Sequence, residues 1–180
     1  MTSCPPADPP RQEQDLCTDC AMCCDGTMFA YVNVSPEEVP ALSADFAIRD
    51  EGGEPNFAQP CHYSVDRKCE IYARRPLTCR SYRCKTLSEL RKNLIPADEA
   101  RRRVDEALAA RNAVIQLLQP GETLPLARKR RTAMSAGSAP ALPDLRFMLA
   151  LTALDLLVDR HFRAPGETMF SRKAASAMED

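Results

Sequence analysis

The sequence predicts a small α+β domain that is mostly helical and loop-rich, with a cysteine-rich core and two C-terminal helices. Three observations lead to this prediction. Eight of the nine cysteines of the 180-residue chain lie between positions 17 and 84. Two long segments with helical periodicity follow them. Fifteen prolines against six glycines indicate many interrupted segments. A chain of this length fits one domain with a helical appendage.

The N-terminal part of the chain shows little regular pattern before the first cysteines. Residues 1–15 are rich in proline and polar side chains and lack an apolar period, so we expect a disordered tail. After the first cysteines, Thr27–Val34 is rich in β-branched and aromatic residues and predicts a short strand. We expect the cysteine-rich domain to span residues 16–90.

A short helix and a loop are expected in the middle of this domain. Ser35 and Glu38 form a capping-box pattern that predicts a short helix ending at Pro40 or slightly later. The following segment, 49–60, is expected to be a loop. A single helical turn is predicted just before Pro76, because a proline disfavours helix in the residue before it.

The C-terminal half predicts two helices joined by a linker, within a helical region 96–163. The first helix is expected at Ala97–Leu118 and the second at Pro143–Phe162. Residues 125–143 are basic and rich in Ala, Ser and Pro, which predicts a linker. Residues 164–180 are expected to be a flexible tail. The second helix carries a stripe at helical spacing: Phe147, Leu151, Leu154, Val158 and Phe162. Four further apolar residues widen this stripe, so we expect burial on more than one side: Leu145, Met148, Leu149 and Leu156.

Composition and charge exclude several classes of function. The net charge is −1, so no global field attracts nucleic acid or a membrane. The basic run at 128–131 has no interleaved aromatic residues, which makes a nucleic-acid interface the less favoured interpretation. No apolar run is long enough to cross a membrane. The N-terminus shows no secretory signal, so we expect a cytoplasmic protein whose thiols stay reduced.

The cysteines form two groups of four. The first group has the spacing C-x2-C-x2-C-C, and the second follows within 24 positions, between 61 and 84. The eight residues are Cys17, Cys20, Cys23, Cys24, Cys61, Cys69, Cys79 and Cys84. Four thiolates close a structural zinc site, and C-x2-C-x2-C also wraps iron–sulfur clusters. Cys4 lies in the tail and is not expected to be a ligand. Because successive side chains diverge, we expect Cys23 and Cys24 to point to different places and the two groups to interleave.

Two other interpretations of these thiols are less favoured. Disulfides need an oxidising compartment, and nothing in the N-terminus indicates one. A thioredoxin-like C-x-x-C needs a βαβ setting, which the proline-rich flanks do not provide. Metal binding is therefore the preferred interpretation, with Zn²⁺ or an iron–sulfur cluster as the cofactor. The tight first group favours iron–sulfur slightly, while the irregular second group does not discriminate between the two.

Two segments carry a resemblance to a known family. The sequence "CTDCAMCC" and the segment "CEIYARRPLTCRSYRC", residues 69–84, resemble the CxxCxxCC (YkgJ-like) family of zinc- or iron-chelating cysteine-cluster proteins. The resemblance covers residues 17–84 and implies a metal site. Most of this family has no assigned reaction. One branch is similar to a flagellin lysine N-methylase with an iron–sulfur cluster, but this chain has no Gly-rich loop that would hold a methyl donor, so the activity is not carried over.

Other side chains near the cysteines have expected supporting roles. Eight thiolates on two divalent ions would carry a charge of about −4. Nearby guanidinium groups would offset that charge, and anion or substrate binding is their alternative role. These residues are Arg75, Arg80 and Arg83, and Tyr72 and Tyr82 are expected to pack over the site. His62 could be a mixed ligand, although a surface position is favoured because the thiols suffice.

Three functions remain open from the sequence. The first is a metal-binding module with a structural or redox role, whose partner is a metal ion; a protein partner is compatible with it. The second is a metal-dependent enzyme that modifies proteins, by analogy with the methylase branch. The third is metal sequestration or delivery. A coordination position open to solvent beside Arg75 or Tyr82 would favour an enzyme.

Overall fold

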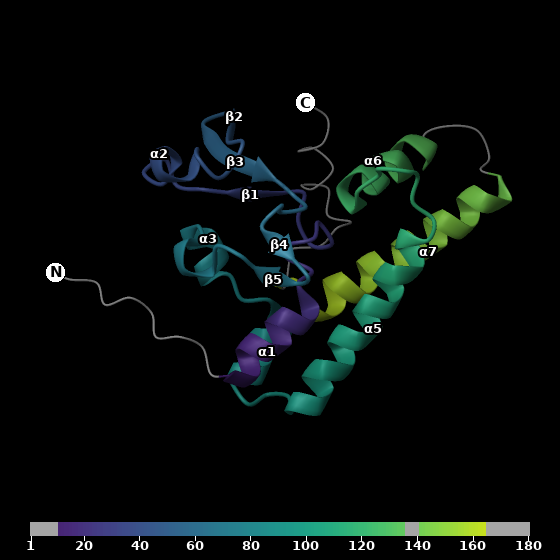
Figure 1. The fold of residues 1–180 in the computed structure, drawn as a ribbon. Helices are drawn as coiled ribbons and strands as arrows, with labels where there is room; N and C mark the ends of the chain where they lie inside the picture. Colours follow the sequence, from purple (N-terminus) through teal and green to yellow (C-terminus); the bar gives the residue numbers. More distant parts are fainter. Residues whose placement is uncertain (1–10, 136–140, 165–180) are drawn as a thin grey trace.

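Two small layers, one helical and one containing the sheet, make up the fold (Figure 1). The structure is a computed structural model and describes residues 11–135 and 141–164. The elements follow the order α1 (Arg11–Cys20), β1 (Tyr31–Asn33), α2 (Val39–Leu42), β2 (Arg49–Glu51), β3 (Glu54–Ala58), β4 (Ser64–Val65), β5 (Lys68–Cys69), the 3-10 turn η1 (Tyr72–Arg74), α3 (Leu77–Ser81), α4 (Lys85–Arg91), α5 (Ala97–Ile115), α6 (Leu124–Ser135) and α7 (Leu142–His161). About half of the residues are helical, so the α+β class is confirmed.

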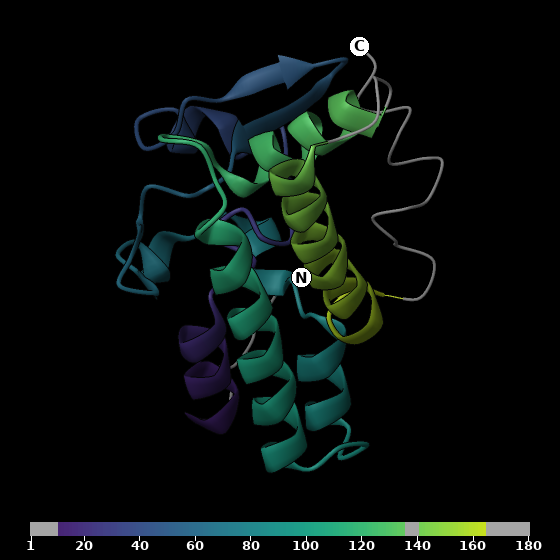
Figure 2. The same ribbon diagram turned by 90° about the vertical axis from the view of Figure 1, so that its right-hand side faces the viewer.

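The helical layer is built around α5. Figure 2 shows α1 and α4 on the two sides of α5, and α7 also packs against it. The predicted helices 97–118 and 143–162 are confirmed as α5 and α7. The predicted stripe of α7 is entirely buried: Phe147, Leu151, Leu154, Val158 and Phe162. It shares one hydrophobic cluster with α1, α4 and α5. The larger core of the described chain therefore lies between helices, and a core made of cysteines is not confirmed.

The outer face of α7 differs from the prediction. Leu149 and Leu156 are 71% and 56% exposed, and Leu145 is 42% exposed, whereas they were expected to be buried. Only the stripe faces α5, because no described element covers the opposite side of α7. The wider apolar pattern was thus a poor guide to burial on that side.

The sheet layer holds three short antiparallel strands in the order β1-β3-β2, with Val32 opposite Phe57. A second hydrophobic cluster lies beneath it, and the rings of Phe46 and Phe57 stack at 4.1 Å. The prediction of a loop at 49–60 was wrong, because β2 and β3 form a hairpin there. Its turn contains Gly52 and Gly53, both with positive φ, a conformation that glycine adopts without strain.

Three short elements, β1, η1 and α2, can be compared with the predicted strand, turn and helix. The strand and the turn before Pro76 are confirmed as β1 and η1, although β1 is shorter than predicted. Ser35 donates its backbone N–H and hydroxyl to Glu38, yet α2 begins only at Val39, later than the Ser35 cap predicted. The helix ends at Leu42, which agrees with the predicted end at Pro40 or slightly later.

The linker and the tails also need correction. The helix α6 covers residues 125–135 of the predicted linker, and with α4 four helices follow Cys84 in the described chain, where two were predicted. Residues 11–15 of the predicted N-terminal tail belong to α1. Residues 1–10, 136–140 and 165–180 lie outside the described residues. Among the helices that are described, none has the length and apolar character needed to cross a membrane.

Candidate metal centre

The first cysteine group spans the end of α1 and the turn that follows it. Cys17 and Cys20 are three positions apart in the last turn of α1, so they lie on the same helix face. Ala21 then adopts a φ of 52°, and its carbonyl accepts from the N–H of Cys24 at 2.8 Å. This tight turn leads from the helical layer towards the sheet. We call residues 21–28 the cysteine loop.

The adjacent cysteines of this loop point to the same place, contrary to the prediction. The Sγ atoms of Cys23 and Cys24 lie 3.6 Å apart. The loop winds so tightly that consecutive side chains can converge at their tips. Ligand sulfurs about 2.3 Å from a tetrahedral zinc ion are separated by about 3.8 Å. The pair therefore already has the separation of two ligands of one thiolate site.

Three cysteines of the second group lie beside the sheet. Cys61, Cys69 and Cys79 all pack against the hydrophobic cluster under β1 and β3. The N–H of Cys61 donates to the carbonyl of Cys24 at 2.8 Å, which joins the two cysteine segments directly. Cys69 pairs with Ser64 across β4 and β5. We call Cys24, Cys61, Cys69 and Cys79 the sheet-side cysteines.

The remaining member of the second group lies on the helical side. Cys84 begins α4, and its Sγ accepts from the N–H of Leu87 at 3.4 Å. Cys20 and Cys84 both pack against the helical cluster, and α1 contacts α4. Cys17 lies one turn before Cys20 and is exposed. We call Cys17, Cys20 and Cys84 the helix-side cysteines; Cys23, whose sulfur contacts that of Cys24, belongs to neither set.

The electrostatics of the thiols follow the same division. The pKa of the Cys79 thiol is raised to about 12, first by burial and then by negative charge on Cys24, Cys61 and Cys69. Burial likewise raises the pKa of Cys20 to about 12, with Cys84 and Cys17 as the nearest like charges. The pKa of Cys24 is raised first by its hydrogen bond to Cys23 and then by burial. The buried thiols of each set therefore stay protonated more readily than free cysteine. A bound cation would favour their thiolate form instead.

Arg75 is the predicted supporting residue that lies closest to this chemistry. Its positive charge lowers the pKa of Cys24, Cys69 and Cys79, in each case against larger effects that raise it. The guanidinium carbon lies 3.6 Å from the centre of the Tyr72 ring, and Nε donates to the Tyr72 carbonyl. Arg75 is therefore held where it can compensate thiolate charge.

The other predicted supporting residues form hydrogen bonds or ring contacts with groups other than the thiols. Arg80 donates to the Ala73 carbonyl at 2.7 Å, and Arg83 donates to the Tyr82 carbonyl at 2.8 Å. The Tyr82 ring packs edge-on against Phe29 in the helical cluster. His62 is exposed and its ring lies 4.1 Å from that of Tyr63, as expected for a surface histidine.

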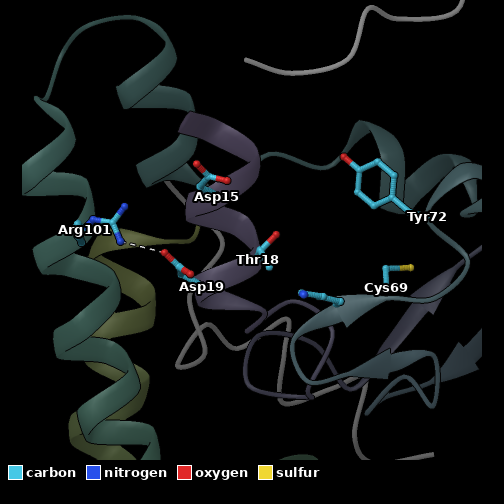
Figure 3. Close-up of a pocket in the computed structure, with 7 residues that line it drawn as sticks. Asp15, Thr18, Asp19, Cys69, Tyr72 and Arg101 are labelled. Atoms are coloured by element: carbon cyan, nitrogen blue, oxygen red, sulfur yellow. Dashed lines mark hydrogen bonds and ion pairs between the residues drawn. The ribbon is translucent and has the colours of Figure 1, made fainter. Parts of the chain in front are cut away.

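A cleft of about 560 Å³ opens beside the sheet-side cysteines (Figure 3). Figure 3 shows the α1 side chains on one wall and Cys69 with Tyr72 on the other. Arg101 and Asp19 form an ion pair of 2.9 Å at its edge. The lining residues are Asp15, Thr18, Asp19, Lys68, Cys69, Tyr72 and Arg101. Solvent can therefore approach the thiol of Cys69 between α1 and β5.

The thiols approach one another without completing a coordination site. Across residues 11–135 and 141–164, no three Cys, His, Asp or Glu side chains are arranged to hold a metal ion. The donor chemistry nevertheless fits zinc or an iron–sulfur cluster, because no disulfide joins any of the eight thiols and thiolates are soft ligands. The backbone hydrogen bond from Cys61 to Cys24 brings the two cysteine segments together at this point.

Sequence reasoning missed the cations that hold the cysteine loop. Arg111 of α5 forms an ion pair with Asp25 at 2.7 Å, and Arg128 of α6 donates to the carbonyls of Gly26 and Thr27. The basic run containing Arg128 was interpreted as a solvated linker. The one available signal was the apolar residues before it, Leu124 and Ala127, which are buried at helical spacing.

The small fold and the cysteine spacing together define a cysteine-cluster domain. The family model CxxCxxCC, described as a "putative zinc- or iron-chelating domain", matches residues 16–103. This part of the chain belongs to that family, and the resemblance drawn from the motifs is confirmed. No curated protein and no solved structure matches the chain.

Proposed function

We propose that this protein is a cytoplasmic metal-binding module in which the eight cysteines hold zinc or an iron–sulfur centre with a structural or redox role. The observation that carries the proposal is the Cys23–Cys24 pair, whose sulfurs are 3.6 Å apart with further thiols on both sides. Seven of the eight thiols are only partly buried and one is exposed, whereas cysteines that serve packing alone are usually fully buried. The thiolates of the eight cysteines are soft ligands that both metals prefer.

The arrangement of the thiols supports two centres built from both cysteine segments. The first would use the sheet-side cysteines, and Arg75 would offset part of their charge. The second would use the three helix-side cysteines, and Cys23, the one cysteine of the eight in neither set, would be its fourth ligand, with its sulfur 3.6 Å from that of Cys24 in the first centre. Because each set draws on both segments, metal binding would fasten the cysteine loop to β5 and α3 on one side and to α4 on the other.

Metal analysis of protein purified without oxygen tests the proposal. We expect about two metal equivalents or one to two clusters per chain, and visible absorbance if the centre is iron–sulfur. Cys79→Ser should lose metal, whereas Cys4→Ser, which changes the one cysteine outside the eight, should retain it. A colourless protein with zinc would contradict the slight preference for iron–sulfur. A reduced protein that binds neither metal would contradict the proposal itself.

Chelation tests the structural role separately. If the metal fastens the loop, its removal should shift and broaden the amide NMR signals of residues 17–84, because binding free energy at such sites is folding free energy. Signals of α5 and α7 should change less, since their contacts lie in the helical cluster. An unchanged spectrum at 17–84 in the chelated sample would contradict a structural role.

The cleft beside Cys69 favours a second candidate function. A metal-dependent enzyme, or a protein that sequesters or delivers metal, needs a centre that solvent or a partner can reach. The cleft opens on Cys69 and Tyr72, whereas Cys79 lies behind them against β1. Addition of imidazole to the cobalt-loaded protein would perturb its visible spectrum if a position is open. An unchanged spectrum would favour the closed, structural or redox centre.

A further inference from the structure

Side chains from the helices that follow the family domain form hydrogen bonds and an ion pair with the cysteine loop. Arg128 of α6 is buried, and its Nη1 donates to the Gly26 carbonyl at 3.2 Å. Its Nη2 donates to the Thr27 carbonyl at 2.7 Å. These carbonyls follow Cys24 by two and three positions in the chain. One side chain of α6 therefore fixes the backbone that leaves the cysteine pair.

Arg128 is itself held in place from α7. Its Nε and Nη2 donate to Oδ1 of Asp155 at 3.0 and 2.7 Å, and Asp155 is completely buried. Arg131, one helical turn along α6, forms an ion pair with the other carboxylate oxygen at 2.8 Å. A buried guanidinium with carboxylate and carbonyl partners in a fixed fork has one favoured orientation. The loop is thus tied to α6 and, through Asp155, to α7.

The close approach of α6 to the loop is visible at Gly26. This residue has a φ of 82°, and a Cβ placed on it would lie 3.0 Å from Cδ of Pro125. A glycine at this position satisfies both the left-handed backbone and the contact with the first turn of α6. The loop and the helix are therefore matched in shape as well as in hydrogen bonding.

Two further cations from the same part of the chain bind neighbouring residues of the loop. Arg111 pairs with Asp25, whose Oδ1 also accepts from the N–H of Thr27 at 2.8 Å. Arg163 donates to the carbonyl of Met28. Consecutive residues from Asp25 to Met28 are thus each held by an arginine. All three arginines lie after position 103, where the family match ends.

We infer that Arg128 is a positioning residue for the metal-binding loop, held by Asp155, and that the C-terminal helices thereby set how tightly the Cys23–Cys24 pair binds metal. The inference rests on the proposed function. A loop ordered in advance loses less conformational freedom when the ion binds, so its affinity is higher. Groups that orient ligands in this indirect way typically change metal affinity by about 10- to 100-fold when removed.

A cobalt titration of Arg128→Gln with matched controls tests this inference. Arg130→Gln is the control, because Arg130 lies on the same helix and pairs with Glu122 without contacting the loop. Arg128→Lys is the conservative variant, since an ammonium group keeps the charge but cannot form the same fork. Each reduced, metal-free variant is followed by the sulfur-to-cobalt absorbance and by amide hydrogen exchange of residues 21–28.

The expected result separates positioning from general stability. Arg128→Gln should bind cobalt about tenfold or more weakly and exchange faster at residues 21–28. Arg130→Gln should change neither quantity, even if its melting temperature falls, and Arg128→Lys should recover part of the affinity. If Arg128→Gln does not fold, Arg128→Lys compared with Arg130→Gln decides the matter in the same way.

Two outcomes would overturn the inference, and they can be told apart. If the wild-type protein binds cobalt but both Arg128 variants match Arg130→Gln in affinity and loop exchange, Arg128 does not position the loop, and the proposed function stands. If the wild-type protein binds no cobalt, zinc or iron, the proposed function fails first and the inference falls with it.

Discussion

Replacing Asp155 by asparagine should destabilise the protein far more than any other loss of one negative charge on α7. The carboxylate is completely buried and receives Arg128 on one oxygen and Arg131 on the other. The substitution keeps the volume of the side chain but leaves two largely buried guanidinium groups without their counter-ion. Removing one partner of a buried ion pair typically costs about 3–5 kcal/mol.

The magnitude can be compared with the stability of the whole domain. Typical domains have a free energy of unfolding of about 5–15 kcal/mol, so the expected loss is a large part of the total stability. In a chain of this length, each kcal/mol corresponds to a change of about 2–4 °C in Tm, which predicts a fall of roughly 10 °C. Urea unfolding of the reduced, metal-free protein gives the free energy of unfolding directly.

Two comparisons make this prediction refutable. Asp144→Asn removes a carboxylate from the first turn of the same helix, where its interaction with the helix dipole contributes about 0.3–1 kcal/mol. In a double-mutant cycle, Arg128→Met and Asp155→Asn should show a coupling energy of at least about 1 kcal/mol. A loss for Asp155→Asn no larger than that for Asp144→Asn, or additive effects in the cycle, would show that the buried network does not support α6 and α7.

Three further predictions concern the thiols, α7 and the loop. The pKa of Cys20 is raised from 9.0 to about 12, so this thiol ionises at lower pH in the unfolded chain than in the folded protein. Between pH 9 and 12 the free energy of unfolding of the metal-free protein should therefore fall by about 1.4 kcal/mol per pH unit from this thiol. Urea unfolding measures this fall, and a free energy of unfolding that does not change with pH would contradict the burial of Cys20. Phe147→Ala should cost about 3–5 kcal/mol, whereas Leu149→Ser, on the exposed face of the same helix, should cost under about 0.5 kcal/mol; equal losses would place α7 differently. Gly26→Ala should lower Tm and speed hydrogen exchange in the cysteine loop, because the added Cβ meets Pro125 and the φ is positive; unchanged exchange would contradict the close contact with α6.

The two long helices could be predicted because their signal is local. A stripe at helical spacing from Phe147 to Phe162 needs only one partner surface to become a buried face, and α5 provides it. The same reasoning failed for Leu149, since periodicity does not reveal whether a second partner exists. The hairpin at Gly52–Gly53 was missed although the paired glycines are a hairpin signal, because proline and charged residues in its strands resemble a loop.

The candidate site was predictable by residue type but not by arrangement. The eight candidate ligands come from cysteine spacing and stay a prediction, as does their interleaving; the backbone hydrogen bond from Cys61 to Cys24 shows only that the two segments meet. Convergence of Cys23 and Cys24 was not foreseen, because it depends on the turn at Ala21. Arg128 was not foreseen either, since its carbonyl partners lie about a hundred positions earlier in the chain. Long-range contacts of this kind leave no periodic pattern in the sequence.

The C-terminal helices are of interest because most of their length lies beyond the end of the family match. The match ends at position 103, inside α5, yet the arginines that hold residues 25–28 all come later. A short cysteine loop cannot bury enough apolar surface to fix its own backbone, so its order must come from a metal, from packing, or from both. Here Arg111 of α5, Arg128 of α6 and Arg163, which follows α7, bind consecutive residues of the loop. On the proposed function, the cysteine motif would specify which ligands are present, while the chain beyond it would determine how rigidly they are held.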